Sequence, residues 1–213
     1  MEFRDVVTAR RMVRAYDPTR PVPDRTLTDL LELAIRAPSA GFSQGWDFVV
    51  LRSPADRDRF WAASADPDAA PGAGPDRWLR GMQTAPVLVL CLSDRDRYLD
   101  RYAEPDKGWT DRDPARWPVP YWDVDTGMAG LLLLLAAVDQ GLAGCFFGVP
   151  PERQEAVLTE FGAPAGHRVV AVISLGYRAA DGSDRRSPSL RRGRRPLAEV
   201  AHDGDFGTSW DVR

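Results

Sequence analysis

Apolar residues spaced three and four positions apart predict two amphipathic helices near the start of the chain. Phe3, Val6 and Val7 share one face of the first helix, and Arg10 falls on the same face. A second helix begins after two prolines at Asp24, which can cap it. The buried stripe of this second helix consists of Leu27, Leu30, Leu31 and Ala34.

Short runs rich in Val, Leu, Ile and Phe predict strands. These runs cover residues 46–51, 86–92, 144–148 and 168–175. Further helices are predicted after Ser53-Pro54, from Pro150, and over residues 77–83, 94–104 and 122–140. Because the strands and helices do not alternate one by one, we expect an α+β domain with a mixed central sheet and helices on both faces.

Length and composition indicate one well-buried domain. The chain has 213 residues, 44% of them hydrophobic, and a net charge of −3, so no positive field recruits nucleic acid or an anionic membrane. The longest apolar run, residues 128–138, is too short to span a bilayer, and no signal-peptide core precedes it. We therefore expect a cytoplasmic protein with one domain over residues 1–200 and a polar tail at 201–213.

Cysteine and histidine are too sparse to indicate a metal or thiol centre. Cys91 and Cys145 lie in apolar segments, which predicts buried, reduced thiols. The two cysteines and two histidines are too far apart in the sequence for a zinc-binding pattern. His167 precedes the last predicted strand and is expected to be structural or exposed.

Two internal stretches lack a regular hydrophobic pattern. Residues 65–76 are rich in Pro, Gly, Ala and Asp, which predicts a mobile loop. Residues 105–121 contain Trp109, Trp117 and Tyr121. A long loop with several aromatics is typical of a substrate lid, and packing of the loop upon itself is the equal alternative.

The strongest chemical signal lies between residues 10 and 46. Arg10, Arg11 and Arg14 cluster at helical spacing, and the rigid fork of a guanidinium suits planar anions such as phosphate. Residues 38–44 form a loop of mostly small residues, which lets backbone amides approach a flat ligand closely. Together these features indicate a phosphorylated, planar cofactor, whereas a solvated helix face is the alternative for the arginines alone.

Five segments in order resemble the FMN-dependent nitroreductase-like flavoprotein superfamily. They are RRMVRAYD (residues 10–17), APSAGFSQGW (37–46), GLAGCFFG (141–148), VISLGY (172–177) and RRGRRPLAEV (191–200). The resemblance implies an intertwined homodimer that holds two FMN molecules at the subunit interface.

The same resemblance implies roles for the basic residues. Arg10 matches the residue that holds the FMN phosphate, within the cluster that Arg11 completes. Arg14 matches a position near the flavin N1/O2 edge, where a cation stabilises negative charge on the reduced ring. Arg192 and Arg194 match a basic pair that closes on the phosphate.

Residues on both sides of the flavin ring follow from the resemblance as well. The partner subunit would contribute Pro38, Ser39 and Ala40. The same chain would contribute Phe146, Phe147 and Gly148, with the Gly148 amide pointing at N5. Because neighbouring strand residues face opposite sides, at most one phenylalanine side chain touches the ring. The pyrimidine edge would be lined by Arg77 and Arg80, and the substrate face by Phe42, Trp117 and Tyr121.

These implications predict an enzyme in which the flavin does the redox chemistry, without a Ser-His-Asp or Cys-His constellation. NAD(P)H would give hydride to flavin N5, leave, and be replaced by a flat organic acceptor such as a nitroaromatic, quinone or enone. This is a ping-pong cycle. NADH and NADPH both stay open as donors, and a deazaflavin stays open in place of FMN.

Two departures from the family pattern leave other functions open. Met12 stands where the family often has a small hydroxyl residue. Residues 42–46 read Phe-Ser-Gln-Gly-Trp where Asn-x-Gln-Pro-Trp is common, so an aromatic reshapes the substrate face. The alternatives are a flavin-fragmenting enzyme, a peptide or metabolite dehydrogenase, and a non-catalytic flavin-sequestering or sensing protein. Gly148 argues against the first, because such enzymes have a serine there.

Overall fold

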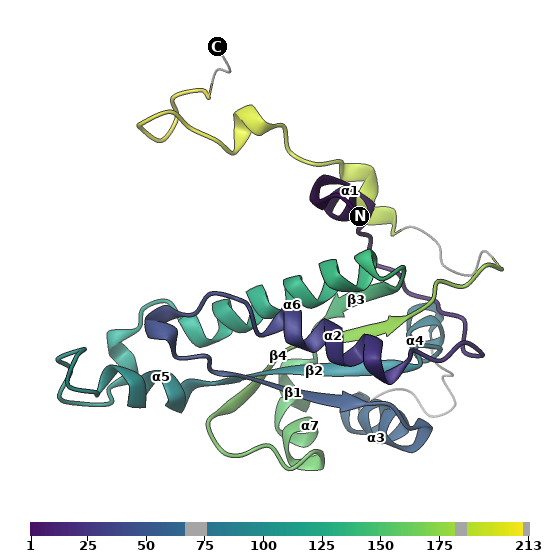
Figure 1. The fold of residues 1–213 in the computed structure, drawn as a ribbon, viewed down its shortest axis with the longest axis horizontal. Helices are drawn as coiled ribbons and strands as arrows, with labels where there is room; N and C mark the ends of the chain where they lie inside the picture. Colours follow the sequence, from purple (N-terminus) through teal and green to yellow (C-terminus); the bar gives the residue numbers. More distant parts are fainter. Residues whose placement is uncertain (67–75, 182–186, 211–213) are drawn as a thin grey trace.

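The computed structural model describes residues 1–66, 76–181 and 187–210, and its centre is a four-stranded sheet (Figure 1). The strand order is β1 (Trp46–Leu51), β2 (Val87–Asp94), β4 (His167–Gly176) and β3 (Ala143–Phe147). The three pairings are antiparallel, and an isolated parallel bridge joins Met12 to Gly144. Nearly all of the loop predicted at residues 65–76 lies outside the described residues.

Helices cover both faces of the sheet because side chains along each strand alternate in direction. On β2, Val87, Val89 and Cys91 pack in one cluster with α2 (Asp24–Ala34) and α6 (Tyr121–Asp139). The intervening Leu88, Leu90 and Leu92 pack in the opposite cluster, which includes side chains of α3 (Pro54–Ser64) and α7 (Gln154–Glu160). The predicted α+β class with helices on both faces is therefore confirmed (Figure 1).

The long helix α6 is the centre of one layer. Among the described residues it is the one helix long and apolar enough to cross a bilayer, yet half of that stretch is buried inside the fold. Ala129, Leu133 and Ala137 are fully buried, which identifies α6 as a core helix. Gly144 of β3 lets it pack closely, since a Cβ there would lie 2.7 Å from the Leu134 side chain.

Several helices begin where the sequence signals predict. Ser53 caps α3, its Oγ accepting from the amide of Asp56 at 3.0 Å. Asp76 caps α4 (Arg77–Met82), and Asp94 caps α5 (Arg95–Tyr102). Short 3-10 helices occur at Ala40–Phe42, Pro114–Arg116, Pro151–Arg153, Pro188–Arg192 and Leu197–Glu199.

The N-terminal segment corrects one prediction. Helix α1 (Phe3–Ala9) ends before the arginine cluster, and Arg10 has the extended angles φ −56° and ψ 126°. The chain then runs along the sheet edge, where the amide of Val13 donates to the carbonyl of Gly144 at 3.0 Å. The three arginines therefore do not share a helix, because pairing with β3 satisfies the backbone there instead.

Both ends of the chain project from the layered body (Figure 1). In α1 Phe3 is 74% exposed, and the C-terminal arm, residues 188–210, carries further exposed apolar side chains. They are Leu190, Leu197, Val200, Phe206 and Trp210. The segment predicted as a polar tail thus holds two exposed aromatics, and a bridge between His202 and Ser209 folds it back on itself.

Candidate functional site

The extended segment after α1 presents its arginines in different ways. Nη1 of Arg10 is buried and has no hydrogen-bond partner among the described residues. Nη1 of Arg14 donates to the carbonyl of Met12 at 3.1 Å, and Arg11 is exposed. A buried guanidinium donor without a partner is rare and calls for an explanation, such as an anion that is not part of the chain itself.

The sheet edge brings this segment against β3. Met12 pairs with Gly144, and the Met12 sulfur accepts from the amide of Phe146 at 3.4 Å. The thioether thus bonds to the protein backbone at the position where a hydroxyl residue is common in the resembling family. The segment that carries Arg10, Arg11 and Arg14 and the strand that carries Phe146, distant in sequence, are consequently neighbours in the fold.

Phe146 and Phe147 point to opposite faces of β3. Phe146 packs against the α6 layer, where a Cβ on Gly130 would lie 3.0 Å from its ring. Phe147 stacks on Trp61 at a centroid distance of 5.9 Å and meets the edge of Trp78 at 5.6 Å. At most one of these rings can therefore face a ligand on a given side of the strand.

Gly148 follows β3 and is open to approach. The residue is exposed, and a Cβ built on it meets no atom of the described residues within 4 Å. Its backbone can therefore come close to a flat ligand. Helix α4, which carries Arg77 and Arg80, packs closely against the N-terminal segment, since a Cβ on Gly81 would lie 2.1 Å from the carbonyl oxygen of Arg14.

The loop at residues 38–44 has a strained backbone. Gly41 has φ 61°, and the non-glycine residues Phe42 and Gln44 have φ 57° and 52°. Such angles are uncommon for side-chain-bearing residues and persist only where the surroundings enforce them. The Ser39 hydroxyl accepts from the amide of Gln44 at 3.0 Å, and Phe42 is left 75% exposed.

Two helices hold this loop in place. From α6, Oδ2 of Asp125 accepts from the amide of Ala40 at 2.8 Å and from the hydroxyl of Tyr98 at 2.7 Å. From α5, Nε of Arg101 donates to the carbonyl of Gly41 at 2.9 Å. Burial, followed by the bond to Asp125, raises the pKa of Tyr98 far above its usual range, so its phenol stays protonated and donates.

Beside this loop, aromatic side chains between residues 98 and 122 form a cluster. Its members are Tyr98, Tyr102, Trp109, Trp117, Tyr121 and Trp122. Trp117 is central, and its Nε1 is buried with no hydrogen-bond partner among the described residues. Tyr121 stays 43% exposed, and Tyr102 lies against Gly41, where an added Cβ would be 2.6 Å from its ring. The cluster supports the interpretation that the loop at residues 105–121 packs upon itself. At the edge of the cluster, Tyr102 contacts the strained loop at residues 38–44.

Comparison with known proteins decides the family. The model of the Nitroreductase family matches residues 7–177, most of the chain. The chain belongs to the nitroreductase family. It is 31% identical over 205 residues to a 4-nitrobenzoate reductase from Nocardioides sp., covering 84% of this chain and 81% of that protein. It is also 28% identical over 200 residues to an NADH dehydrogenase from Thermus thermophilus, covering 85% and 89%.

A solved structure supports the nitroreductase fold. A nitroreductase family protein from Clostridium difficile 630 superimposes with a TM-score of 0.67 at 20% identity, covering 98% of this chain and 99% of that one. At that identity the likeness concerns the fold alone. Family membership confirms the predictions of the superfamily and of an oxidoreductase.

Within this nitroreductase-family fold the remaining predicted residues lie on two other segments of the chain. Arg192 and Arg194 belong to the C-terminal arm and are exposed. Pro38, Ser39 and Ala40 lie on the loop held by α5 and α6. Their approach to a flavin from a second subunit stays a prediction, since one chain is described.

Two functional candidates had little signal in the sequence. Asp125 and Tyr98 hold the loop of this nitroreductase-family protein, yet their meeting depends on how α5 and α6 pack. The one available hint was an acidic residue just before the apolar run at 128–138. A carboxylate on the buried side of such a helix requires donors, and here Ala40 and Tyr98 supply them.

Proposed function

We propose that this protein is a homodimeric FMN-dependent oxidoreductase that carries electrons from NAD(P)H to a flat organic acceptor. The observation that carries the proposal is the buried Arg10 Nη1, which lacks a partner among the described residues and lies on the segment that pairs with β3. An anionic group at this place would satisfy the donor that the chain leaves unpaired.

The residues present fit a flavin phosphate. A buried dianion needs about two or three guanidinium forks to offset its loss of hydration. Arg10 and Arg11 would supply cations from the N-terminal segment, and the exposed Arg192 and Arg194 of the arm are available to close over the phosphate. The fit therefore rests on a donor set that matches the charge of the group.

The ring would lie beside Gly148, where the surface is open. Phe146 or Phe147 would border it on the side that faces the strand, and Arg14 would place a cation at the N1/O2 edge. FMN would supply two-electron redox chemistry at N5, with NAD(P)H as the hydride donor and a flat organic acceptor in a ping-pong cycle. The chain itself binds, orients and shields the reacting groups.

Exposed apolar faces support a dimer. On α6, Val124 and Leu131 are 41% and 47% exposed, and at the C-terminal end of α2, Leu33 and Ile35 are both 48% exposed. Together with the exposed apolar side chains of α1 and the arm, they offer apolar surface that a second copy would cover. A second copy packed on this surface would bring its Pro38, Ser39 and Ala40 toward the first copy's flavin.

The substrate face would consist of Phe42, Trp117 and Tyr121. The strained backbone of the loop presents Phe42 outward, where an aromatic ring can stack on a flat acceptor. The similarity to a 4-nitrobenzoate reductase supports a nitroaromatic as the first acceptor to test, with quinones and enones beside it.

Anaerobic titration of the purified protein tests this proposal. NADH and NADPH are added separately to the flavin-loaded dimer, and nitrobenzoate, a quinone and an enone are then offered to the reduced protein. Bleaching of the flavin absorbance by a nicotinamide, followed by its return with an acceptor, is expected. A purified protein that binds no added FMN would refute the proposal, as would a bound flavin that neither nicotinamide reduces.

A further inference from the structure

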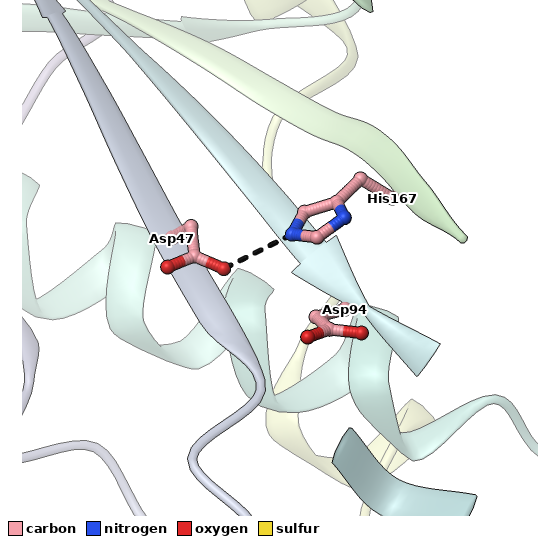
Figure 2. A group of neighbouring side chains, drawn as sticks. All are labelled: Asp47, Asp94 and His167. Carbon is pink, nitrogen blue, oxygen red and sulfur yellow. Dashed lines mark hydrogen bonds and ion pairs between the residues drawn. The ribbon is translucent and has the colours of Figure 1, made fainter. Parts of the chain in front are cut away.

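Three strands bring Asp47, Asp94 and His167 together at one end of the sheet (Figure 2). Asp94 ends β2 and lies directly opposite His167, the first residue of β4, while Asp47 on β1 lies opposite Leu92. One ligand atom from each of the three side chains lies within 4.8 Å of the other two. We propose that this triad binds a divalent first-row transition-metal ion, Zn²⁺ being the probe of choice.

The contacts of the two ring nitrogens of His167 also suit a cation. Its side chain is only 9% exposed, with Nδ1 3.2 Å from the carbonyl oxygen of Pro164 and Nε2 3.1 Å from Oδ2 of Asp47. In either neutral tautomer one ring lone pair faces an oxygen lone pair, and a cation at Nε2, either a proton or a metal ion, removes the conflict. A metal ion also fits the contact at Nδ1, because metal-binding histidines commonly donate their other N–H to a backbone carbonyl in this way.

The spacing suits a metal ion. Zinc binds histidine nitrogen and carboxylate oxygen at about 2.0–2.2 Å, which puts two tetrahedral ligands about 3.3 Å apart. The distance between Nε2 of His167 and Oδ2 of Asp47 is 3.1 Å. One imidazole with two carboxylates favours Zn²⁺ over Mn²⁺, and both over Mg²⁺, which prefers oxygen and retained water.

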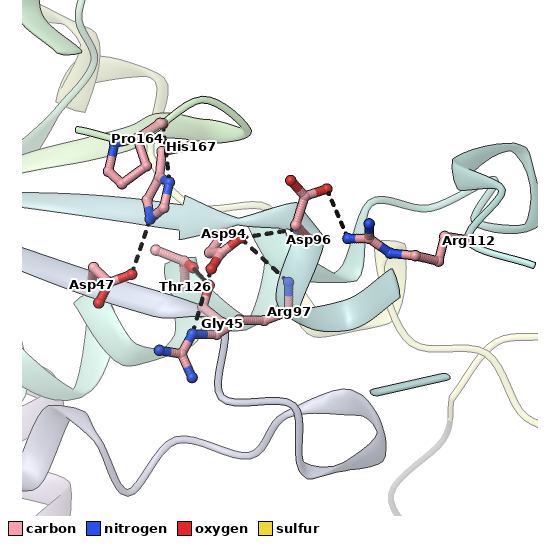
Figure 3. Close-up of polar contacts among 9 residues, drawn as sticks. All are labelled: Gly45, Asp47, Asp94, Asp96, Arg97, Arg112, Thr126, Pro164 and His167. Carbon is pink, nitrogen blue, oxygen red and sulfur yellow. Dashed lines mark hydrogen bonds and ion pairs between the residues drawn. The ribbon is translucent and has the colours of Figure 1, made fainter. Parts of the chain in front are cut away.

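Asp94 can turn one oxygen to the ion. Its Oδ1 accepts from the amides of Asp96 at 2.9 Å and Arg97 at 3.3 Å, as the cap of α5 (Figure 3). Its Oδ2 lies 3.4 Å from Nε of Arg97, whose side chain is 58% exposed. Such an exposed pair is weak, so Arg97 competes with the metal only modestly.

The half-exposed side chain of Asp47 leaves the triad accessible from solvent, and an ion bound there would have a structural consequence. His167 also lines a cavity of about 420 Å³, with Gln154, Glu155 and Arg168 among its other walls. An ion there would join β1, β2 and β4 at the start of α5, the helix whose Arg101 holds the carbonyl of Gly41. The metal would thus stiffen the end of the sheet that carries the strained loop.

Calorimetric titration of the full-length, chelator-treated protein with Zn²⁺ tests the site. One ion is expected to bind per chain, and His167→Asn is expected to weaken binding roughly tenfold or more. The chain has two histidines, so His202→Asn is a matched control that leaves affinity unchanged. Arg97→Gln is expected to strengthen binding, because it removes the competing cation.

A second variant keeps the test decisive if His167→Asn fails to fold. Asp47 is 48% exposed on its side chain, so Asp47→Asn is expected to fold normally and still weaken Zn²⁺ binding. Co²⁺ added in place of Zn²⁺ is expected to show visible absorbance bands that Asp47→Asn alters. No binding by the parent protein, unchanged affinity in Asp47→Asn, or loss of binding in His202→Asn would each overturn the proposal.

Discussion

The carboxylate of Asp125 lies 2.8 Å from the backbone nitrogen of Ala40 and ties the strained loop to helix α6. Asp125 is 1% exposed and accepts a second hydrogen bond from Tyr98. A buried carboxylate held by two neutral donors is sensitive to loss of its charge, because charge-assisted hydrogen bonds are the stronger kind. This contact connects the packing of the core with the geometry of the candidate site.

Asp125→Asn is expected to lower the free energy of unfolding by about 1–3 kcal/mol, since the part-buried Ala40 amide and the buried Tyr98 hydroxyl lose their charged acceptor. Denaturant unfolding measures this change, and the exposed Asp100→Asn is the control. If the loop positions a flavin, kcat/KM falls further than residual FMN occupancy explains. Unchanged stability and activity would show that the loop holds its shape without this contact.

Arg10→Met is expected to separate stability from function. The flavin-free variant should be at least as stable as the parent, because a buried donor without a partner among the described residues is removed. Its FMN affinity should fall by roughly ten- to hundredfold, the loss of a hydrogen bond to a charged group. Equilibrium dialysis measures the FMN affinity, and Arg95→Met, at an exposed position, is the control. Equal FMN affinities of Arg10→Met and the parent protein would show that the phosphate site lies elsewhere.

Gly148→Ala is expected to lower flavin affinity without changing stability, whereas Gly81→Ala is expected to lower stability. A Cβ on Gly148 meets nothing within 4 Å in the described chain, so the variant should melt like the parent yet bind FMN less well. A Cβ on Gly81 would lie 2.1 Å from the backbone oxygen of Arg14, so this variant should lose about 1–3 kcal/mol by overpacking. Thermal melts and flavin titrations distinguish the two; full flavin affinity in Gly148→Ala would contradict the assigned ring position.

Leu131→Arg is expected to produce monomers. Leu131 is 47% exposed in the chain but lies on the apolar face proposed to meet a second copy, where a charge would be buried. Light scattering reports the mass. Ala55→Arg, at an exposed position of α3 on the other side of the sheet, should leave it unchanged. A parent protein that is itself monomeric would rule out a flavin site shared between subunits.

Cys91 is expected to resist thiol reagents until the protein unfolds. Burial raises its pKa from 9.0 to about 12, so the native state holds the thiol proton more tightly than the unfolded state. Between those pH values the unfolded state binds fewer protons, and the free energy of unfolding declines as pH rises. Denaturation across this alkaline range should show a shallower decline in Cys91→Ala. Rapid labelling of native Cys91 would contradict its burial.

Much of the fold was predictable because its signals are local. The stripe Leu27, Leu30 and Ala34, the cap at Ser53 and the alternation along β2 depend on neighbouring residues only. The candidate site was partly predictable, since its arginines and glycine-containing loop stand out in composition. Their roles toward a flavin stay predictions that the variants above can test.

The sequence alone determined the helices, the strands, the family resemblance and the residue types available for binding an anion. Tertiary structure alone decided that the segment at residues 10–14 is extended and pairs with β3. It also decided that Asp125 accepts from the Ala40 amide and that Asp47 and Asp94 lie close to His167. The reason is physical. Periodicity and capping arise within a few residues, whereas strand register and helix packing decide which distant side chains share one place.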